Sequence, residues 1–127
     1  MMNEYLTRMG TNSQAMTTRE STHYRAAAAF ARQVRQQYDE IVETVVLYGS
    51  VARGEERGVH SDVDLIVVLA DGVDKQVAEP AIRELAYDSE LEFGVVLSLL
   101  VLASEEYHHS DEPYLQHVHQ DGQLLHG

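Results

Sequence analysis

The spacing of apolar and polar residues changes along the chain, and these changes predict alternating helices and strands. Residues 21–40 are rich in alanine and contain no Gly or Pro, which favours a helix. Three runs are dominated by β-branched and other apolar residues, as buried strands are. They are IVETVVLYG at 41–49, DVDLIVVLA at 62–70 and FGVVLSLLVLAS at 93–104.

Helices are predicted in the segments around these strands. Thr17 to Glu20 has the pattern of a capping box that opens the first helix. Ser50 is predicted to cap a short helix at 51–55. Residues 73–92 are predicted as mostly helical, with a kink or a restart at Pro80. One later helix is predicted to begin after Ser104, and a last helix is predicted to end at Gly122. The order of elements is that of a layered α/β (α+β) domain.

Length and composition limit the possible classes of protein. A length of 127 residues predicts a single domain, at 17–127, and the lack of hydrophobic periodicity in residues 1–16 predicts a flexible tail there. Because there is no Cys, disulfides, thiolate metal sites and a Cys nucleophile are excluded. No apolar run reaches transmembrane length and the N-terminus lacks a signal-peptide core, so we expect no membrane association and a cytoplasmic protein.

The chain is strongly acidic, with a net charge of −12 and a single lysine, Lys75. Such a surface repels nucleic acid, so a nucleic-acid partner is not expected. The acidity fits either a partner-binding surface or a halophilic protein, in which salt screens the self-repulsion. The scarcity of lysine favours the halophilic interpretation, and the charge alone therefore does not identify a function.

Two aspartates lie in the second predicted strand, which is otherwise apolar. Asp62 and Asp64 are two residues apart, so in a strand they project to the same side. Close carboxylates repel each other unless a cation or a proton lies between them, and hard oxygen ligands suit Mg²⁺ or Mn²⁺. The alternative is that both are solvated residues of an edge strand, but the run 65–70 is too apolar for an exposed edge.

The loop between the first two strands carries residues suited to phosphate. Gly49 allows close approach of the backbone, and Ser50 adds a hydroxyl beside a helix N-terminus. Arg53 and Arg57 are candidates to neutralise phosphate charge, although surface solubility would explain them as well. Divalent metal, phosphate-binding backbone and arginine together indicate phosphoryl or nucleotidyl transfer.

The segment GSVARGEERGVHSDVDL resembles the signature of the polymerase-β-like nucleotidyltransferase superfamily, in its minimal nucleotidyltransferase branch. The resemblance implies the nucleotidyltransferase fold, a small mixed β-sheet with helices packed on it. It implies that Gly49 and Ser50 hold ATP or another NTP, and that Asp62 and Asp64 hold Mg²⁺ or Mn²⁺. It also implies a function as the antitoxin of a toxin–antitoxin pair, with a helical HEPN-type toxin as partner. Some such antitoxins adenylylate their toxin.

Two departures from the family pattern bear on catalysis. The loop between Ser50 and Asp62 is slightly longer than the commonest family spacing, which loops tolerate cheaply. Active members also carry a third carboxylate on a later strand, where this chain has Ser98. Strand parity offers Glu92 as a substitute ligand. We also expect the strand at 93–102 to pair beside the aspartate strand, with Ser98 directed toward the same cleft.

Three functions remain open on this evidence. The first is an enzyme that transfers NMP from an NTP to a hydroxyl of a protein or small molecule. The second is an antitoxin or binding module that acts mainly by contact with a partner, and the third is a nucleotide sensor without turnover. The neutral Ser98 position favours the second and third, whereas the intact Gly-Ser and Asp-x-Asp motifs favour the first and third.

A zinc site is not expected among the histidines, because His117 and His119 do not share a helix face.

Overall fold

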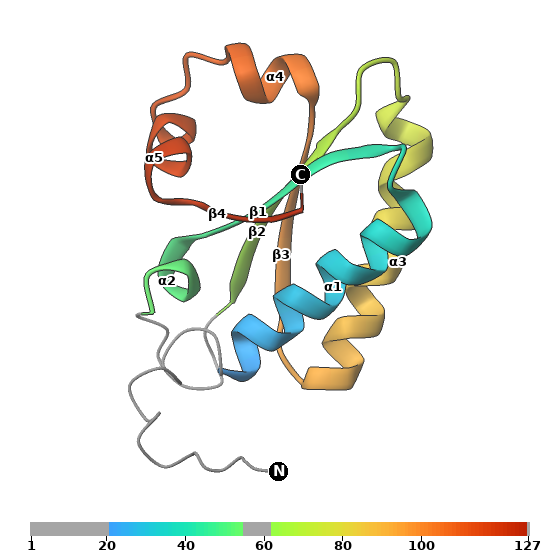
Figure 1. The fold of residues 1–127 in the computed structure, drawn as a ribbon, viewed down its shortest axis with the longest axis vertical. Coiled ribbons are helices and arrows are strands. Elements are labelled where there is room, and N and C mark those ends of the chain that lie inside the picture. Colours follow the sequence, from blue (N-terminus) through green and yellow to red (C-terminus); the bar gives the residue numbers. More distant parts are fainter. Residues whose placement is uncertain (1–20, 55–61, 127) are drawn as a thin grey trace, which may run out of the picture.

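The structure, a computed structural model, describes residues 21–54 and 62–126 (Figure 1). Five helices and four strands occur in this part of the chain. In order they are α1 (Thr22–Tyr38), β1 (Val42–Tyr48), α2 (Gly49–Ala52), β2 (Val63–Leu69), α3 (Lys75–Phe93), β3 (Leu97–Ala103), α4 (Ser104–His109), α5 (Pro113–Asp121) and β4 (Gln123–His126).

The strands form one mixed sheet in the order β3-β2-β1-β4. β1 runs antiparallel to both β2 and β4, whereas β2 and β3 are parallel and are joined through α3. β2 is therefore an interior strand, hydrogen-bonded on both sides. This position explains why its sequence is almost entirely apolar.

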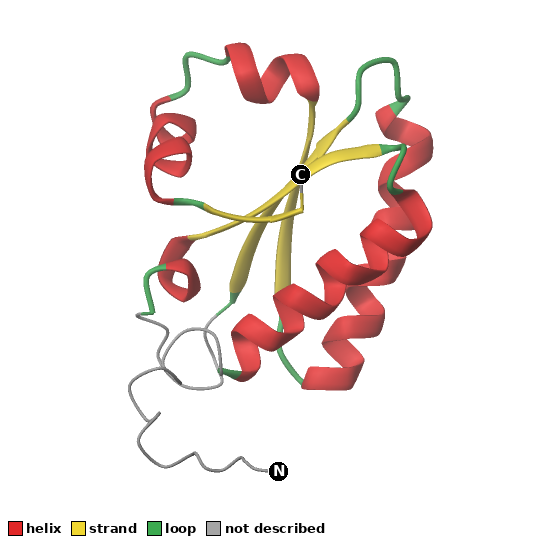
Figure 2. Ribbon diagram, in the orientation of Figure 1, coloured by secondary structure: helices red, strands yellow, loops and turns green. Residues whose placement is uncertain are grey.

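Helices cover both faces of the sheet (Figure 2). Leu65 and Val67 of β2 point to one face and join the core formed with α1 and α3. Ile66 and Val68 point to the other face, where they pack with residues of α4 and α5. Strand alternation thus divides the apolar side chains between two cores. Phe30 of α1 lies in the first core, and Tyr24 and Tyr38 pack against it.

The predicted α/β fold with a small mixed sheet is confirmed, but four details differ. Ser21 is the N-cap of α1 and its hydroxyl accepts from the Tyr24 N–H at 3.0 Å, so α1 begins after the predicted capping box at 17–20. That box, the tail at 1–16 and Arg57 lie outside the described residues. α3 runs through Pro80 without interruption.

The third difference is at the end of α3, and the fourth is at the end of the chain. α3 continues to Phe93 and ends at Gly94, which has a φ of 70° in the left-handed region. The predicted strand therefore begins four residues late, at Leu97. β4 was not predicted from the sequence, and its residues 123–126 pair with β1.

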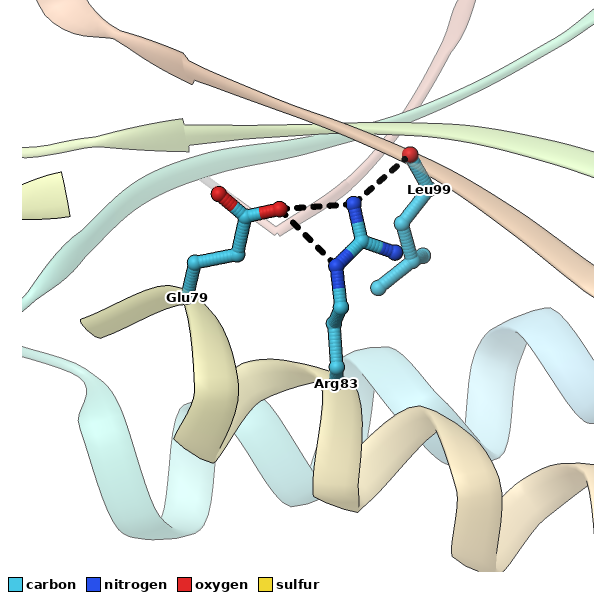
Figure 3. Close-up of polar contacts among 3 residues, drawn as sticks. All are labelled: Glu79, Arg83 and Leu99. Atoms are coloured by element: carbon cyan, nitrogen blue, oxygen red, sulfur yellow. Dashed lines mark hydrogen bonds and ion pairs between the residues drawn. The ribbon is translucent and has the colours of Figure 1, made fainter. Parts of the chain in front are cut away.

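α3 is also fixed to β3 by a polar contact (Figure 3). Arg83 donates from Nε to Glu79 Oε2 at 2.8 Å and from Nη2 to the Leu99 carbonyl at 3.4 Å.

Within residues 21–54 and 62–126, no helix has both the length and the apolar character needed to cross a membrane.

Candidate active site

Asp62 and Asp64 lie at the end of the sheet where β1 ends and β2 begins, here called the carboxylate end. Asp62 directly precedes β2, and Asp64 lies within it opposite Tyr48. Because Val63 and Leu65 belong to the core under α1 and α3, the two aspartates project to the opposite face. The expectation that they share a face is confirmed, and the interior position of β2 excludes the edge-strand alternative.

Gly49 packs directly against the Asp64 carboxylate. It has a φ of 76°, and a Cβ atom at this position would overlap Oδ2 of Asp64 and lie 3.2 Å from its Cγ. Both the backbone conformation and the lack of space therefore require glycine. The short helix α2 begins at Gly49, which places backbone N–H groups of its first turn beside the carboxylates.

Ser50 does not cap this helix as predicted. The N-cap is Tyr48, with extended backbone and no side-chain capping bond, and Ser50 lies inside the first turn. The helix begins two residues earlier than predicted because Gly49 can adopt the left-handed conformation at the strand end. Ser50 remains half-buried at the carboxylate end, next to Gly49.

The electrostatics of the site favour binding of a cation. Asp64 is half-buried, and this burial raises the pKa of its carboxyl group above the ordinary value of 3.8. The charge of Asp62 raises the pKa further, whereas Arg53 lowers it. A divalent cation would remove the repulsion that the two carboxylates exert on each other. Arg53, which was predicted to contact phosphate, is exposed and lies close enough to Asp64 to lower the pKa of that carboxyl group.

Ser98 occupies the position opposite Asp64 on β3. Neighbouring residues of parallel strands point to the same face, so Ser98 shares the face of the aspartates, as predicted. Glu92 does not, because it lies on α3 and the strand-parity argument does not apply to a helix. Within residues 21–54 and 62–126, no three His, Asp or Glu side chains converge as metal ligands.

A cleft of about 180 Å³ adjoins Gly49 and extends to α5. Its walls come from Tyr48 and Arg53 on one side and from His117, Val118 and Asp121 on the other. No residue of α5 was predicted from the sequence to belong to the site. The sequence signal for including α5 was the spacing of four between His117 and Asp121, which puts both on one helix face.

A wider hollow of about 540 Å³ lies beside α4 and includes Ala103, at the end of β3 opposite to Ser98.

These features can be compared with those of known families. Residues 28–116, well over half the chain, match the family model described as a nucleotidyltransferase domain. The chain belongs to this nucleotidyltransferase family. The matched segment contains β1, α2 and β2, and thus both Gly49-Ser50 and the two aspartates. No significant match occurs among curated protein sequences.

Two solved structures share the nucleotidyltransferase fold. One is described as a toxin–antitoxin with AMP-PNP; the identity is 22%, the TM-score is 0.53, and the alignment covers 79% of this chain and 73% of the other. The second is a protein of Sulfolobus solfataricus provisionally assigned as a nucleotidyltransferase, with 19% identity and a TM-score of 0.50. That alignment covers 91% of this chain and 89% of the other. At these identities, the similarity establishes the fold alone.

Proposed function

We propose that this nucleotidyltransferase-domain protein binds ATP or another NTP together with Mg²⁺ or Mn²⁺ at the carboxylate end. Asp62 and Asp64 would hold the cation, and Gly49, Ser50 and Arg53 would contact the phosphates. The single observation that carries this proposal is the half-buried Asp64 carboxylate, which lies against Gly49 and shares a face with Asp62. The toxin–antitoxin structure with AMP-PNP supports a nucleotide ligand by its fold.

The residues present fit a hard divalent cation. Mg²⁺ is commonly held by one or two carboxylates, with waters and substrate phosphates as the other ligands. The cation would neutralise charge on the phosphates as the reaction proceeds. The protein would position the triphosphate through the backbone N–H groups of α2 and the Ser50 hydroxyl. Glu92 is not part of this proposal, because it lies on α3.

The proposed reaction transfers NMP to a hydroxyl group of a protein or small molecule. The hydroxyl oxygen forms a bond to the α-phosphorus, the bond from that phosphorus to the bridging oxygen breaks, and pyrophosphate leaves. The hydroxyl proton passes to a base. Ser98 cannot be that base near neutral pH, because its hydroxyl stays protonated. We infer slow turnover for the chain alone.

We propose that the chain belongs to the minimal nucleotidyltransferase branch and acts as the antitoxin of a pair whose toxin is a helical HEPN-type protein. The motif Gly49-Ser50 with Asp62 and Asp64 supports this assignment, as does the fold shared with a toxin–antitoxin protein. The neutral Ser98 opposite Asp64 favours a second candidate, a catalytically weak antitoxin or nucleotide-binding module that acts by contact.

Calorimetry tests the binding site. ATP with Mn²⁺ should bind the wild type, and the double variant Asp62→Asn with Asp64→Asn should abolish binding. The matched control is Asp71→Asn with Asp111→Asn, which removes the same charge from exposed positions outside the site. Ser50→Ala should weaken binding by about 1–3 kcal/mol, through loss of one phosphate hydrogen bond. Undiminished binding in the double variant would refute the site.

Transfer of label from ATP labelled at the α-phosphate separates the two candidates. The acceptor is the purified product of the neighbouring gene, and wild type is compared with Ser98→Asp. The third carboxylate should raise affinity for Mn²⁺ and speed transfer, because Ser98 lies opposite Asp64. Rapid wild-type transfer that Ser98→Asp does not improve would favour the plain enzyme and would place the missing ligand elsewhere.

A further inference from the structure

The outward face of α3 carries apolar side chains at a spacing typical of helix–helix contacts. Five residues recur at alternating intervals of three and four: Val77, Pro80, Glu84, Tyr87 and Leu91, here called the α3 seam. All five are exposed, and the exposed fractions of Val77, Tyr87 and Leu91 are 73%, 56% and 66%. This spacing is the one by which helices pack side by side along their length.

The α3 seam is distinct from the face by which α3 packs on the sheet. The buried residues of α3 are Ala78, Ile82, Leu85, Ala86 and Ser89, which lie on the other side of the helix. A helix with two apolar faces has a second packing partner beyond its own core. The 14 intervals from Val77 to Leu91 correspond to about 21 Å of helix.

An apolar hollow adjoins the N-terminal end of the seam. It has a volume of about 310 Å³ and is lined by Val77 and Ala81 of α3 together with Tyr38, Ile41 and Val73. A large apolar side chain of a docked helix would fit such a hollow. The hollow and the seam are therefore continuous at Val77.

Charge determines which kind of helix fits. Beside the seam, Arg83 is bonded to Glu79 and to the Leu99 carbonyl, so its charge is balanced within the chain (Figure 3). Exposed Glu84 lies at the middle of the seam, and exposed Asp88 lies next to it. The surface thus presents negative charge at the centre of an apolar stripe, which an Arg or Lys of a partner would complement.

A second copy of this chain does not provide that complement. Pairing of the seam with itself places Glu84 opposite Glu84 of the other copy, whether the helices run parallel or antiparallel about a two-fold axis. Two carboxylates in contact at the centre of an apolar interface repel each other. The net charge of −12 adds repulsion between copies.

We propose that the α3 seam is the docking surface for an amphipathic helix of a different protein, with an Arg or Lys opposite Glu84. This inference rests on the part of the proposed function that gives the chain a protein partner. It assigns that partner to α3, which packs on one face of the sheet, whereas Asp62 and Asp64 of the nucleotide site project to the opposite face.

Photo-crosslinking in the native cell identifies the occupant. A benzophenone amino acid replaces Tyr87 in the full chain, and a control chain carries it at Arg32, an exposed position on α1. The expected result is one recurrent crosslinked peptide, specific to position 87, from a helix with the same spacing and a central basic residue. Crosslinks to a second copy or to residues 1–20 of this chain, or equal crosslinking at both positions, would overturn the proposal.

Affinity for the purified crosslinked protein completes the test. Leu91→Asp should weaken binding at least thirtyfold, and Glu84→Arg at least tenfold. Glu105→Arg changes the net charge equally at an exposed position on α4 and should have little effect. Equal effects of Glu84→Arg and Glu105→Arg would overturn the proposal.

Calorimetry with ATP and Mn²⁺ separates this inference from the nucleotide site. Leu91→Asp should bind nucleotide like wild type, because Leu91 is exposed and lies on α3. The double variant Asp62→Asn with Asp64→Asn should lose nucleotide but retain the helical partner. Loss of nucleotide binding in Leu91→Asp would contradict the separation of the two surfaces.

Discussion

Replacing Gly49 by alanine tests the contact between the first turn of α2 and the Asp64 carboxylate. The new methyl group would overlap Asp64 Oδ2 and lie 3.2 Å from Cγ and 3.4 Å from Cβ of the same residue. The substitution would also hold an L-residue at a φ of 76°. Two separate costs are therefore expected, one from the backbone and one from the displaced carboxylate.

The expected magnitude follows from these two costs. An L-residue in the left-handed region costs about 1–2 kcal/mol, and forcing a methyl group into an occupied space costs about 1–3 kcal/mol. Gly49→Ala should thus lower the free energy of unfolding by about 2–5 kcal/mol. Gly72→Ala is the matched control, because Gly72 has a φ of 84° and no atom near the position of a Cβ, so it should lose about 1–2 kcal/mol.

Urea unfolding of four proteins measures the carboxylate contribution: wild type, Gly49→Ala, Asp64→Ala and the double variant. Removing the carboxylate frees the space, so in the Asp64→Ala background Gly49→Ala should cost no more than Gly72→Ala. The coupling free energy from this cycle should be about 1–3 kcal/mol. Calorimetry should show weaker binding of ATP with Mn²⁺ to Gly49→Ala and unchanged binding to Gly72→Ala.

A coupling free energy near zero would refute this reasoning. In that case Gly49→Ala and Gly72→Ala would destabilise the protein equally, and the left-handed backbone alone would explain the glycine. Undiminished nucleotide binding in Gly49→Ala would further show that the position of Asp64 against Gly49 has no part in the site.

Two other predictions concern ionisable groups. Burial and the charge of Asp62 raise the pKa of Asp64, so its ionised form is disfavoured by folding above that raised pKa, and the cost disappears as the pH falls through it. In the absence of metal, the free energy of unfolding of Asp64→Asn should therefore exceed that of wild type by about 0.5–1 kcal/mol at pH 7, and by less at pH 4. Urea unfolding with a chelator measures this difference, and a variant less stable than wild type at pH 7 would contradict the prediction. Glu43 accepts hydrogen bonds from His108 at 2.6 Å and from Ser104 at 2.8 Å, which lower its pKa below 4.5. Glu43→Gln should cost about 0.5–1 kcal/mol above pH 4.5, and the difference should shrink as the pH falls below that value; a difference independent of pH would argue against the ion pair.

The aspartate motif was predictable because its signal is local. Asp62 and Asp64 must share a face in any strand, and the apolar run after them requires a buried strand. Ser98 could also be placed correctly, since the rest of β3 is apolar and the strand pairs beside β2. The placement of the aspartates depends only on strand geometry, whereas that of Ser98 also used the resemblance to the nucleotidyltransferase family.

The errors arose at helix boundaries and where distant parts of the chain decide the packing. Glu92 was assigned strand parity, but α3 extends to Phe93 until Gly94 ends it in the left-handed region. β4 has only four residues, and its pairing depends on the free side of β1. Ser50 does not have its predicted capping role because the helix already begins at Gly49. The contribution of α5 to the cleft depends on how α5 packs on the sheet, which the sequence of α5 alone does not indicate.

The position of β4 beside β1 has a consequence during protein synthesis. Ribosomes make Tyr48 75 residues before Gln123, so β1 is complete long before its outer partner exists. Until then one side of β1 carries backbone N–H and C=O groups with no strand to pair with, which is the arrangement that recruits strands from other chains. The nascent chain is thus most exposed to aggregation in the interval between translation of β1 and translation of β4.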